Sequence, residues 1–367
     1  MRNAHFSVVG SFLRPQKLKE ARAAFEAGTL DQDGLTAVED ALIRELVAKE
    51  KAAGLPELTD GEFRRATWHL DFMWGFHGVG HSPTETGLPF HGEAAMIDDT
   101  YLTGKVTVDS HPFVEHFKFV KALEEDGHTA KQTIPAPAQF LEQMVMPFAA
   151  ANTRRFYPDT AELEEDLVVG YRKVIRQLYD AGCRTLQLDD CSWGMLVDPN
   201  APRLFGTDDA GLRDIMEQML RVNNRAIEGK PADLTVNTHV CRGNFHSTYA
   251  SSGAYDRVAE FLFARENVNG FFLEFDDARS GGFAPLAKIP EGKNVVLGLI
   301  TTKSPALEDK KTVIRRIEEA SRYVPLERLS LSPQCGFASC EIGNKLTEEE
   351  QWRKIDLVRE IAREVWG

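Results

Sequence analysis

The sequence predicts an α/β protein folded as a (β/α)8 barrel, the TIM barrel. Short β-rich runs alternate with amphipathic helical patterns, which implies parallel strands joined by crossover helices. Eight such repeats fit a chain of 367 residues. Polar residues cluster at the C-terminal ends of nearly all the runs. In a barrel these ends meet at one mouth, whereas in the alternative, a doubly wound open sheet, they are spread along a crevice.

The eight expected strands and the helices between them follow from the spacing of apolar residues. Gly54 and Gly182 follow two of the helical patterns, where a left-handed residue stops a helix. The expected strands are residues 6–9, 57–59, 132–134, 185–188, 234–238, 270–275, 295–300 and 329–332, and the clearest helices are residues 36–53, 161–181, 211–228, 255–265, 307–323 and 347–366.

One segment is too long for a single connection between a strand and a helix. Residues 64–131 follow the second expected strand, are rich in aromatic residues and histidine, and contain a strand-like run at 105–108. We interpret residues 64–131 as an insertion that covers the barrel mouth. The alternative is a satellite hydrophobic cluster. The remainder of residues 1–367 is expected to form one catalytic barrel domain.

Composition excludes several classes of partner. The formal net charge of −13 disfavours nucleic acid and an anionic membrane surface as partners. We expect no signal peptide and no transmembrane helix, because no run approaches about 18 apolar residues. Five cysteines without an export signal are typical of a reducing cytoplasm rather than of a disulfide framework. The oligomeric state stays open, a homo-oligomer included.

Four possible ligands for a soft metal follow successive strands in the second half of the chain. His239 and Cys241 are two residues apart in an extended segment, so both side chains point to one side. Glu274 ends one apolar run and Cys335 follows another. Two thiolates, an imidazole and a carboxylate form a tetrahedral set that suits zinc. Ligands spread over a barrel mouth indicate a catalytic ion rather than a structural one.

Each of these residues also has a purely structural explanation. A cysteine is often a small buried hydrophobic residue, and the Glu274 carboxylate could pair with Arg279. Cys340 competes with Cys335 as a ligand but lies farther from the strand end. Cys183 is expected in the core. Cys191, near the mouth, could be reactive, but a spectator role is expected.

Other polar groups at the same strand ends suit an amino-acid substrate. The segment Gly10-Ser11-Phe-Leu-Arg14 offers backbone N–H groups and a hydroxyl to a carboxylate. Glu62, Asp189 and Asp190 could hold an ammonium group. Their structural alternative is helix capping, or ion pairing with nearby arginines. Together with a thiophilic metal, these groups match an amino acid that carries a thiol.

These segments resemble the catalytic barrel of the cobalamin-independent methionine synthase family. The His-x-Cys, Glu and Cys set is the specific part of the resemblance, which spans nearly the whole chain in the family's order. The matching pieces are Gly10-Ser-Phe12, Asp60-Gly-Glu62, Leu186-Gln-Leu-Asp189, Thr238-His-Val-Cys241, Leu273-Glu274 with Ala278-Arg-Ser280, and Pro333-Gln-Cys-Gly336.

The resemblance implies a zinc ion on His239, Cys241, Glu274 and Cys335. It further implies that Glu62, Asp189 and the segment Gly10–Arg14, here called the Ser11 loop, hold an amino-acid thiol. The full-length type of the family carries an additional N-terminal barrel, so this chain looks like a short single-barrel relative.

One departure from the family pattern concerns proton donation. The family carries a histidine before Ser-Pro after the seventh strand, regarded as a proton donor, where this chain has Lys303-Ser-Pro305. The reference pKa of lysine is far above that of histidine. Lys303 and Asp190 are the candidate acids. The departure leaves the identity of the methyl donor open, the usual methylfolate included.

The expected function is zinc-dependent transfer of a methyl group to the thiol of homocysteine, which forms methionine. The donor is 5-methyltetrahydrofolate or another methyl compound. Bound zinc would keep the substrate sulfur as a thiolate at neutral pH. The alternatives are an alkyltransferase for a different thiol, a barrel decarboxylase resembling uroporphyrinogen decarboxylase, and a non-catalytic protein stabilised by zinc.

Overall fold

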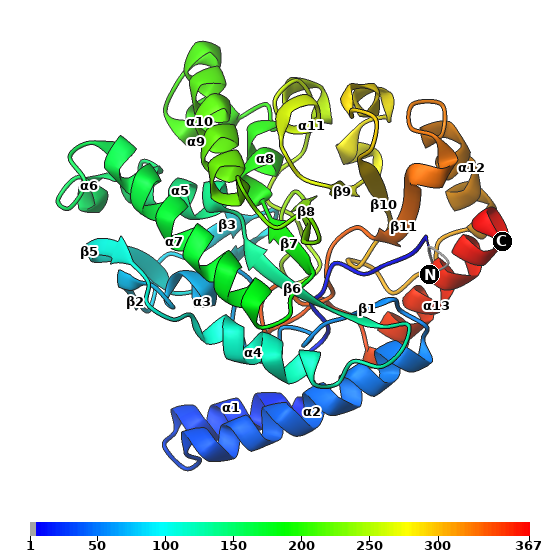
Figure 1. The fold of residues 1–367 in the computed structure, drawn as a ribbon, viewed down its shortest axis with the longest axis horizontal. Coiled ribbons are helices and arrows are strands. Elements are labelled where there is room, and N and C mark those ends of the chain that lie inside the picture. Colours follow the sequence, from blue (N-terminus) through cyan, green and yellow to red (C-terminus); the bar gives the residue numbers. More distant parts are fainter. Residues whose placement is uncertain (1–4) are drawn as a thin grey trace.

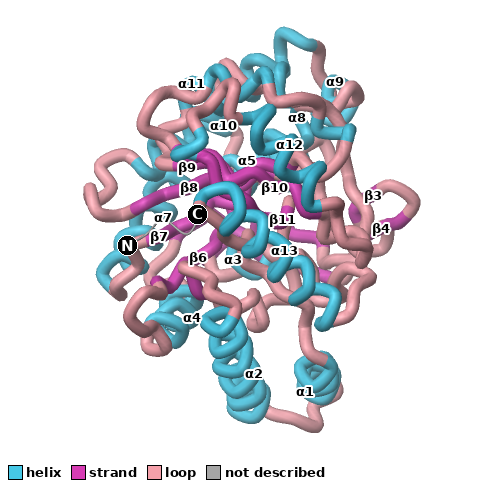
Figure 2. Tube along the Cα trace, turned by 90° about the vertical axis from the view of Figure 1, so that its right-hand side faces the viewer, coloured by secondary structure: helices cyan, strands magenta, loops and turns pink. Residues whose placement is uncertain are grey.

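A curled parallel sheet of seven strands forms the centre of the molecule. The computed structural model describes residues 5–367. The strand order is β1-β6-β7-β8-β9-β10-β11, and every neighbouring pair is parallel. Figure 2 shows the strands gathered at the centre with helices outside them. The strands are β1 Glu57–Leu58, β6 Thr129–Pro135, β7 Thr185–Asp189, β8 Thr235–Val240, β9 Gly270–Glu274, β10 Asn294–Ile300 and β11 Leu329–Pro333.

One of the eight expected strands, residues 6–9, does not form a continuous set of backbone hydrogen bonds with a neighbouring strand. Phe6 makes an isolated parallel bridge to Leu331 of β11. The next carbonyls accept side-chain hydrogen bonds instead: Val8 O from Lys131 Nζ at 2.5 Å and Val9 O from Gln187 Nε2 at 2.9 Å. The described sheet is therefore a half-barrel of seven strands, and the closed (β/α)8 barrel is not confirmed.

Helices form an outer layer around the sheet (Figure 1). Most expected helices occur within a few residues of their predicted bounds, and Gly54 and Gly182 have φ of 74° and 99°, as helix stops require. The helices are α1 Gln16–Glu26, α2 Gln32–Ala52, α3 Leu70–Met73, α4 Pro112–Lys121, α5 Pro137–Val145, α6 Ala150–Thr153, α7 Thr160–Asp180, α8 Cys191–Leu196, α9 Ala201–Phe205, α10 Asp209–Ile227, α11 Leu262–Arg265, α12 Lys310–Ala320 and α13 Glu348–Trp366, with short 3-10 turns η1 Tyr255–Arg257, η2 Ala278–Ser280, η3 Ala284–Lys288 and η4 Leu326–Arg328.

The helix expected at residues 255–265 is wrong. The segment forms only η1 and the single turn α11. Four turn residues, 258–261, separate η1 from α11, so the segment is not one continuous helix, although Val258, Phe261 and Phe263 are buried as in an amphipathic helix. The Tyr255 hydroxyl also donates to Val240 O at 3.1 Å, which fixes the first turn against β8.

Residues 64–131 contain two small antiparallel pairs outside the main sheet. β2 (His77–Ser82) pairs with β5 (Asp99–Thr107), which includes most of the predicted strand at 105–108. Phe72 and Phe76 near this pair pack against Tyr171 of α7, with ring centroids 5.3 and 6.0 Å apart. This half of the segment therefore extends the hydrophobic core.

The second pair, β3 (Leu88–Phe90) with β4 (Glu93–Ala95), contacts the loop that follows β8. The Phe90 and Phe245 rings lie 5.3 Å apart, and His91 N donates to Tyr249 O at 2.8 Å. Within residues 5–367, no helix combines the length and apolar character that crossing a membrane requires.

Candidate metal centre

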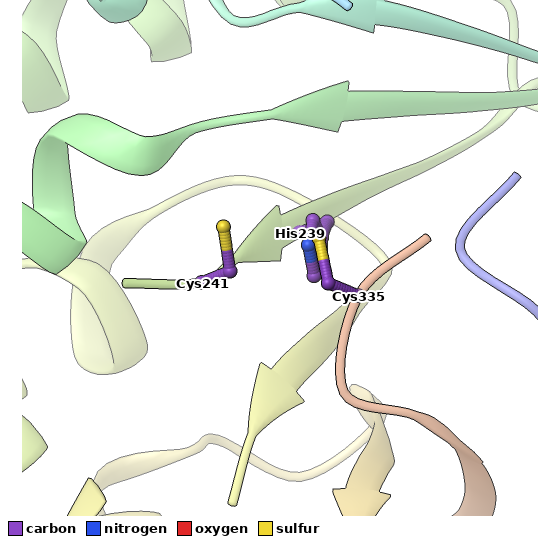
Figure 3. Close-up of side chains that lie close together, drawn as sticks. All are labelled: His239, Cys241 and Cys335. Atoms are coloured by element: carbon purple, nitrogen blue, oxygen red, sulfur yellow. The ribbon is translucent and has the colours of Figure 1, made fainter. Parts of the chain in front are cut away.

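Three of the four predicted metal ligands meet at the C-terminal ends of β8 and β11. His239 lies near the end of β8, Cys241 directly follows that strand, and Cys335 lies two residues beyond β11. One ligand atom from each residue lies within 4.8 Å of the other two, and all three residues are buried. Figure 3 shows Cys335 approaching the end of the strand that carries His239 and Cys241.

The surroundings of His239 fit a bound metal. Both ring nitrogens are buried without a hydrogen-bond partner. A buried polar atom left unpaired costs about 1–3 kcal/mol, and a neutral imidazole is among the commonest metal ligands. The contact with Cys241, together with burial, raises the pKa of Cys335 well above its ordinary value, so the metal-free thiol is neutral. A metal ion would replace that proton.

Glu274 lies beside this group but is not one of its three mutually close members. The fully buried carboxylate accepts from Arg242 N–H at 3.0 Å and pairs with Arg279 Nη2 at 3.1 Å. Burial alone would raise the pKa of Glu274, but Lys303, Arg242 and Arg279 outweigh it and lower the pKa. Glu274 is therefore an ionised carboxylate next to the cluster.

Lys303 faces the same carboxylates. Its Nζ lies 3.9 Å from Glu274 Oε2 and 3.7 Å from Asp276 Oδ2, and has no hydrogen-bond partner. Burial alone would lower the pKa of Lys303, but Glu274 and Asp276 outweigh it and raise the pKa. Lys303 is therefore a cation throughout the neutral range.

Two buried acids of the predicted substrate site carry raised pKa values. Burial raises the pKa of Glu62 to about 7 and that of Asp189 to about 7, and the Asp189 charge adds to the shift of Glu62. Glu62 Oε2 has no hydrogen-bond partner. Asp189 is paired in register with His239, which places their side chains on the same face of the sheet. Glu62 also has a φ of 61°, an uncommon strained conformation often found at functional sites.

The Ser11 loop packs against the turn that carries Cys335. An added Cβ at Gly336 would lie 1.8 Å from Ser11 Oγ, so only glycine permits this approach. Phe337 N also donates to Ser11 O at 2.9 Å. The segments that carry Ser11 and Cys335 are therefore held side by side, although they lie far apart along the chain.

Asp190 points away from the cluster. Its two carboxylate oxygens accept from Ser192 and, at 2.7 Å, from Asn223 of α10, in the layer between the sheet and the helices. Consecutive residues of a strand point to opposite faces, so Asp189 and Asp190 cannot both face the cluster. Asp190 was expected at the barrel mouth, but its carboxylate lies on the other face of the sheet.

Cys191, expected to be a spectator, contacts one of the predicted ligands. Its Sγ lies 3.1 Å from Cys241 Sγ. The expected core position of Cys183 is met, and Cys340 lies outside the cluster, in an isolated bridge to Thr67. Sequence spacing gives no signal for the Cys191 contact, because Cys191 and Cys241 lie on different βα units.

Comparison with known proteins now identifies the family. The family described as "Cobalamin-independent synthase, Catalytic domain" matches residues 153–363, which include the His239, Cys241 and Cys335 cluster. The chain belongs to this family. It is 43% identical over 363 residues to the uncharacterized protein YxjG of Bacillus subtilis (strain 168), covering 98% of this chain and 93% of that protein.

Two further relatives of the cobalamin-independent synthase family cover nearly the whole chain. A solved structure from Listeria monocytogenes, of a protein named as a candidate vitamin-B12 independent methionine synthase, has a TM-score of 0.77 and 38% identity over 98% of this chain and 97% of that chain. The methionine synthase of Pyrococcus abyssi (strain GE5 / Orsay) is 23% identical over 98% of this chain and 93% of that protein. The chain is thus a short relative of the cobalamin-independent synthases, and its fold resembles their catalytic domain.

Proposed function

We propose that the chain is a zinc-dependent S-methyltransferase that converts homocysteine to methionine. The observation that carries this proposal is the buried His239, Cys241 and Cys335 group, in which the imidazole nitrogens lack any other partner. Membership of the cobalamin-independent synthase family supports it. The methyl donor is 5-methyltetrahydrofolate or another methyl compound.

In this proposal His239, Cys241 and Cys335 hold the zinc ion, and Glu274 supplies the fourth ligand. Bound zinc lowers the pKa of a thiol, so that the sulfur is a nucleophile at neutral pH. Glu274 suits an exchangeable ligand, because Arg242 N–H and Arg279 already hold its carboxylate when no metal is bound. The chain can therefore accommodate the carboxylate both on and off the metal.

The remaining residues orient the amino acid. Glu62, with one unpaired buried oxygen, and Asp189, on the same face as His239, bind the substrate ammonium group in this proposal. The Ser11 loop binds the carboxylate. Holding thiol and methyl donor in line supplies much of the rate enhancement.

Lys303 remains our candidate for contact with the leaving group, but as a cation rather than as a weak acid. Its raised pKa disfavours proton release at neutral pH, whereas its charge can balance an anionic donor. Asp190 bonds Ser192 and Asn223 on the helix side of the sheet, which makes it a positioning residue in this scheme.

The architecture of the proposal is a single barrel domain over residues 1–367 in the cytoplasm. In this proposal residues 6–9 take the place of the eighth barrel strand, next to β11, through the Phe6 bridge to Leu331. Residues 64–131 form the insertion, and its β3–β4 pair covers the loop after β8.

Metal analysis joined to X-ray absorption spectroscopy tests the proposal. We expect one zinc per chain with two sulfur ligands, rising to three when homocysteine is added. Protein that holds no zinc after purification without chelators would contradict it. An unchanged sulfur count with homocysteine, but an increase with another thiol, would favour the alternative of a zinc-dependent alkyltransferase for that thiol.

A further inference from the structure

A third thiol, that of Cys191, contacts the His239, Cys241 and Cys335 group from outside the proposed ligand set. Cys191 Sγ lies 3.1 Å from Cys241 Sγ. A disulfide needs a separation of about 2.0 Å, so the two sulfurs must approach by only about 1 Å to form a bond. Cys335 Sγ also lies within 4.8 Å of Cys241 Sγ and has Ser339 Oγ as a further neighbour at 3.8 Å, so Cys241 has two thiols beside it.

The close approach of α8 to the end of β8 brings Cys191 near Cys241. Cys191 is the first residue of α8, and an added Cβ at Gly194 in the same helix would lie 1.8 Å from Cys241 O. The absence of a side chain at Gly194 therefore lets α8 lie directly against the end of β8. Ser251 Oγ donates to Gly194 O at 2.7 Å and holds α8 from the other side.

The two cysteines differ in their access to solvent. Cys191 is partly exposed, whereas Cys241 has 3% of its surface exposed. A small oxidant in solution therefore meets Cys191 first. The sulfenic acid that forms on an exposed cysteine condenses readily with a thiol already in contact with it.

We propose that Cys191 and Cys241 form a reversible disulfide when the protein meets hydrogen peroxide. The peroxide O–O bond breaks as the Cys191 sulfur takes one oxygen, and the first water leaves. The Cys241 sulfur then forms the S–S bond while the S–O bond breaks, and the second water leaves. Two thiols lose two electrons, and one peroxide becomes two waters.

The consequence for the metal rests on the proposed function. Because Cys241 is one of the proposed zinc ligands, the disulfide removes a sulfur ligand and releases the ion. The cross-link itself rests only on the contact between the two sulfurs. A cellular thiol reductant would restore both cysteines and allow zinc to bind again.

Peroxide treatment of the metal-free and the zinc-loaded full chain tests the inference. Peptide mass spectrometry without reduction is expected to find the Cys191–Cys241 cross-link in the metal-free protein. A chromogenic chelator is expected to detect zinc release from the loaded protein in step with the cross-link, and dithiothreitol to reverse both. Cys191→Ser should abolish the cross-link and slow zinc release by about tenfold or more.

Cys340→Ser is the matched control, because Cys340 is another partly exposed thiol that lies outside the cluster. It should behave as the unaltered chain. A cross-link between Cys241 and Cys335, or sulfinic acid on Cys191 with no cross-link, would overturn the inference. If the chain binds no zinc, the proposed function fails, while the cross-link in the metal-free protein still decides this inference.

Discussion

At the residue scale, the candidate metal centre is marked by buried side-chain atoms that have no hydrogen-bond partner within the described residues. His239 has two buried ring nitrogens without hydrogen bonds, and Glu62 and Lys303 each have one such atom. Folded proteins seldom leave such atoms unpaired. The unpaired atoms of these three residues therefore support the metal and substrate roles proposed for them.

Replacing a proposed ligand tests whether the ion is catalytic. Cys241→Ser should lose zinc and reduce methyl transfer by more than about 100-fold, because a hydroxyl is a poor ligand for zinc beside thiolate and imidazole. The barrel should stay folded, since the serine fills nearly the same volume. Zinc analysis, activity and circular dichroism check this together. Loss of the fold would instead favour the non-catalytic protein stabilised by zinc.

The raised pKa values of Glu62 and Asp189, about 7 for each, predict the pH dependence of substrate binding. Both acids are neutral below these values and ionised above them. An ammonium group binds the ionised form, so KM for homocysteine should rise as pH falls below about 7. Glu62→Gln should raise KM and flatten this profile. A KM that stays constant between about pH 8 and about pH 6 would contradict the assignment.

Lys303 predicts a stability effect. Replacing Lys303 by Met leaves the buried Glu274 and Asp276 with less compensating charge, which should cost about 3 kcal/mol in the free energy of unfolding. The same change should raise the pKa of Glu274, because Lys303 is the largest of the groups that lower it. Urea unfolding with and without zinc checks the first expectation. Equal stability of the unaltered and Lys303→Met chains in metal-free form would contradict this expectation. It would show that the remaining arginines balance the two carboxylates without Lys303.

At the element scale, the contact between α8 and β8 controls the position of Cys191. Gly194→Ala places a Cβ on the Cys241 carbonyl and should destabilise the chain by about 1–3 kcal/mol. It should also separate the two sulfurs and slow their cross-linking. Gly282→Ala is the control, since no atom lies within 4 Å of its added Cβ. Thermal unfolding of both variants measures the difference, and equal stability would contradict the account of α8.

The strands and the longer helices could be predicted because their signals are local. Alternation in β8 placed His239 and Cys241 on one face, and glycines marked the ends of α2 and α7. The same alternation rule could have shown that Asp190 faces opposite to Asp189. Cys191 could not be found this way, because its contact with Cys241 depends on packing between two units of the fold.

At the scale of the whole molecule, the closure of the sheet was the part that sequence could not supply. Residues 6–9 have the composition of a strand, but Lys131 and Gln187 side chains, rather than a neighbouring backbone, bond the Val8 and Val9 carbonyls. Strand composition does not distinguish these two kinds of partner. The identity of the methyl donor is likewise absent from the local pattern around Lys303.

Removal of the metal should weaken the molecule without unfolding it. Zinc present at about 100 times its dissociation constant stabilises a folded protein by about 2.7 kcal/mol. The large hydrophobic core does not include the cluster, so the metal-free chain should still unfold cooperatively. Calorimetry with and without a chelator measures the shift. A chain that is unfolded at room temperature after chelation would contradict a purely catalytic ion.

The pairing of Phe6 with Leu331 has a consequence for the order of assembly during synthesis. The chain is made from its N-terminus onward, so Phe6 leaves the ribosome long before its partner Leu331 in β11. The contact between the Ser11 loop and the turn that carries Cys335 and Gly336 cannot form until that turn has been made. The segments that carry Ser11 and Cys335 can therefore meet only after β11 has been made, so chains truncated before β11 are expected to lack the proposed metal centre.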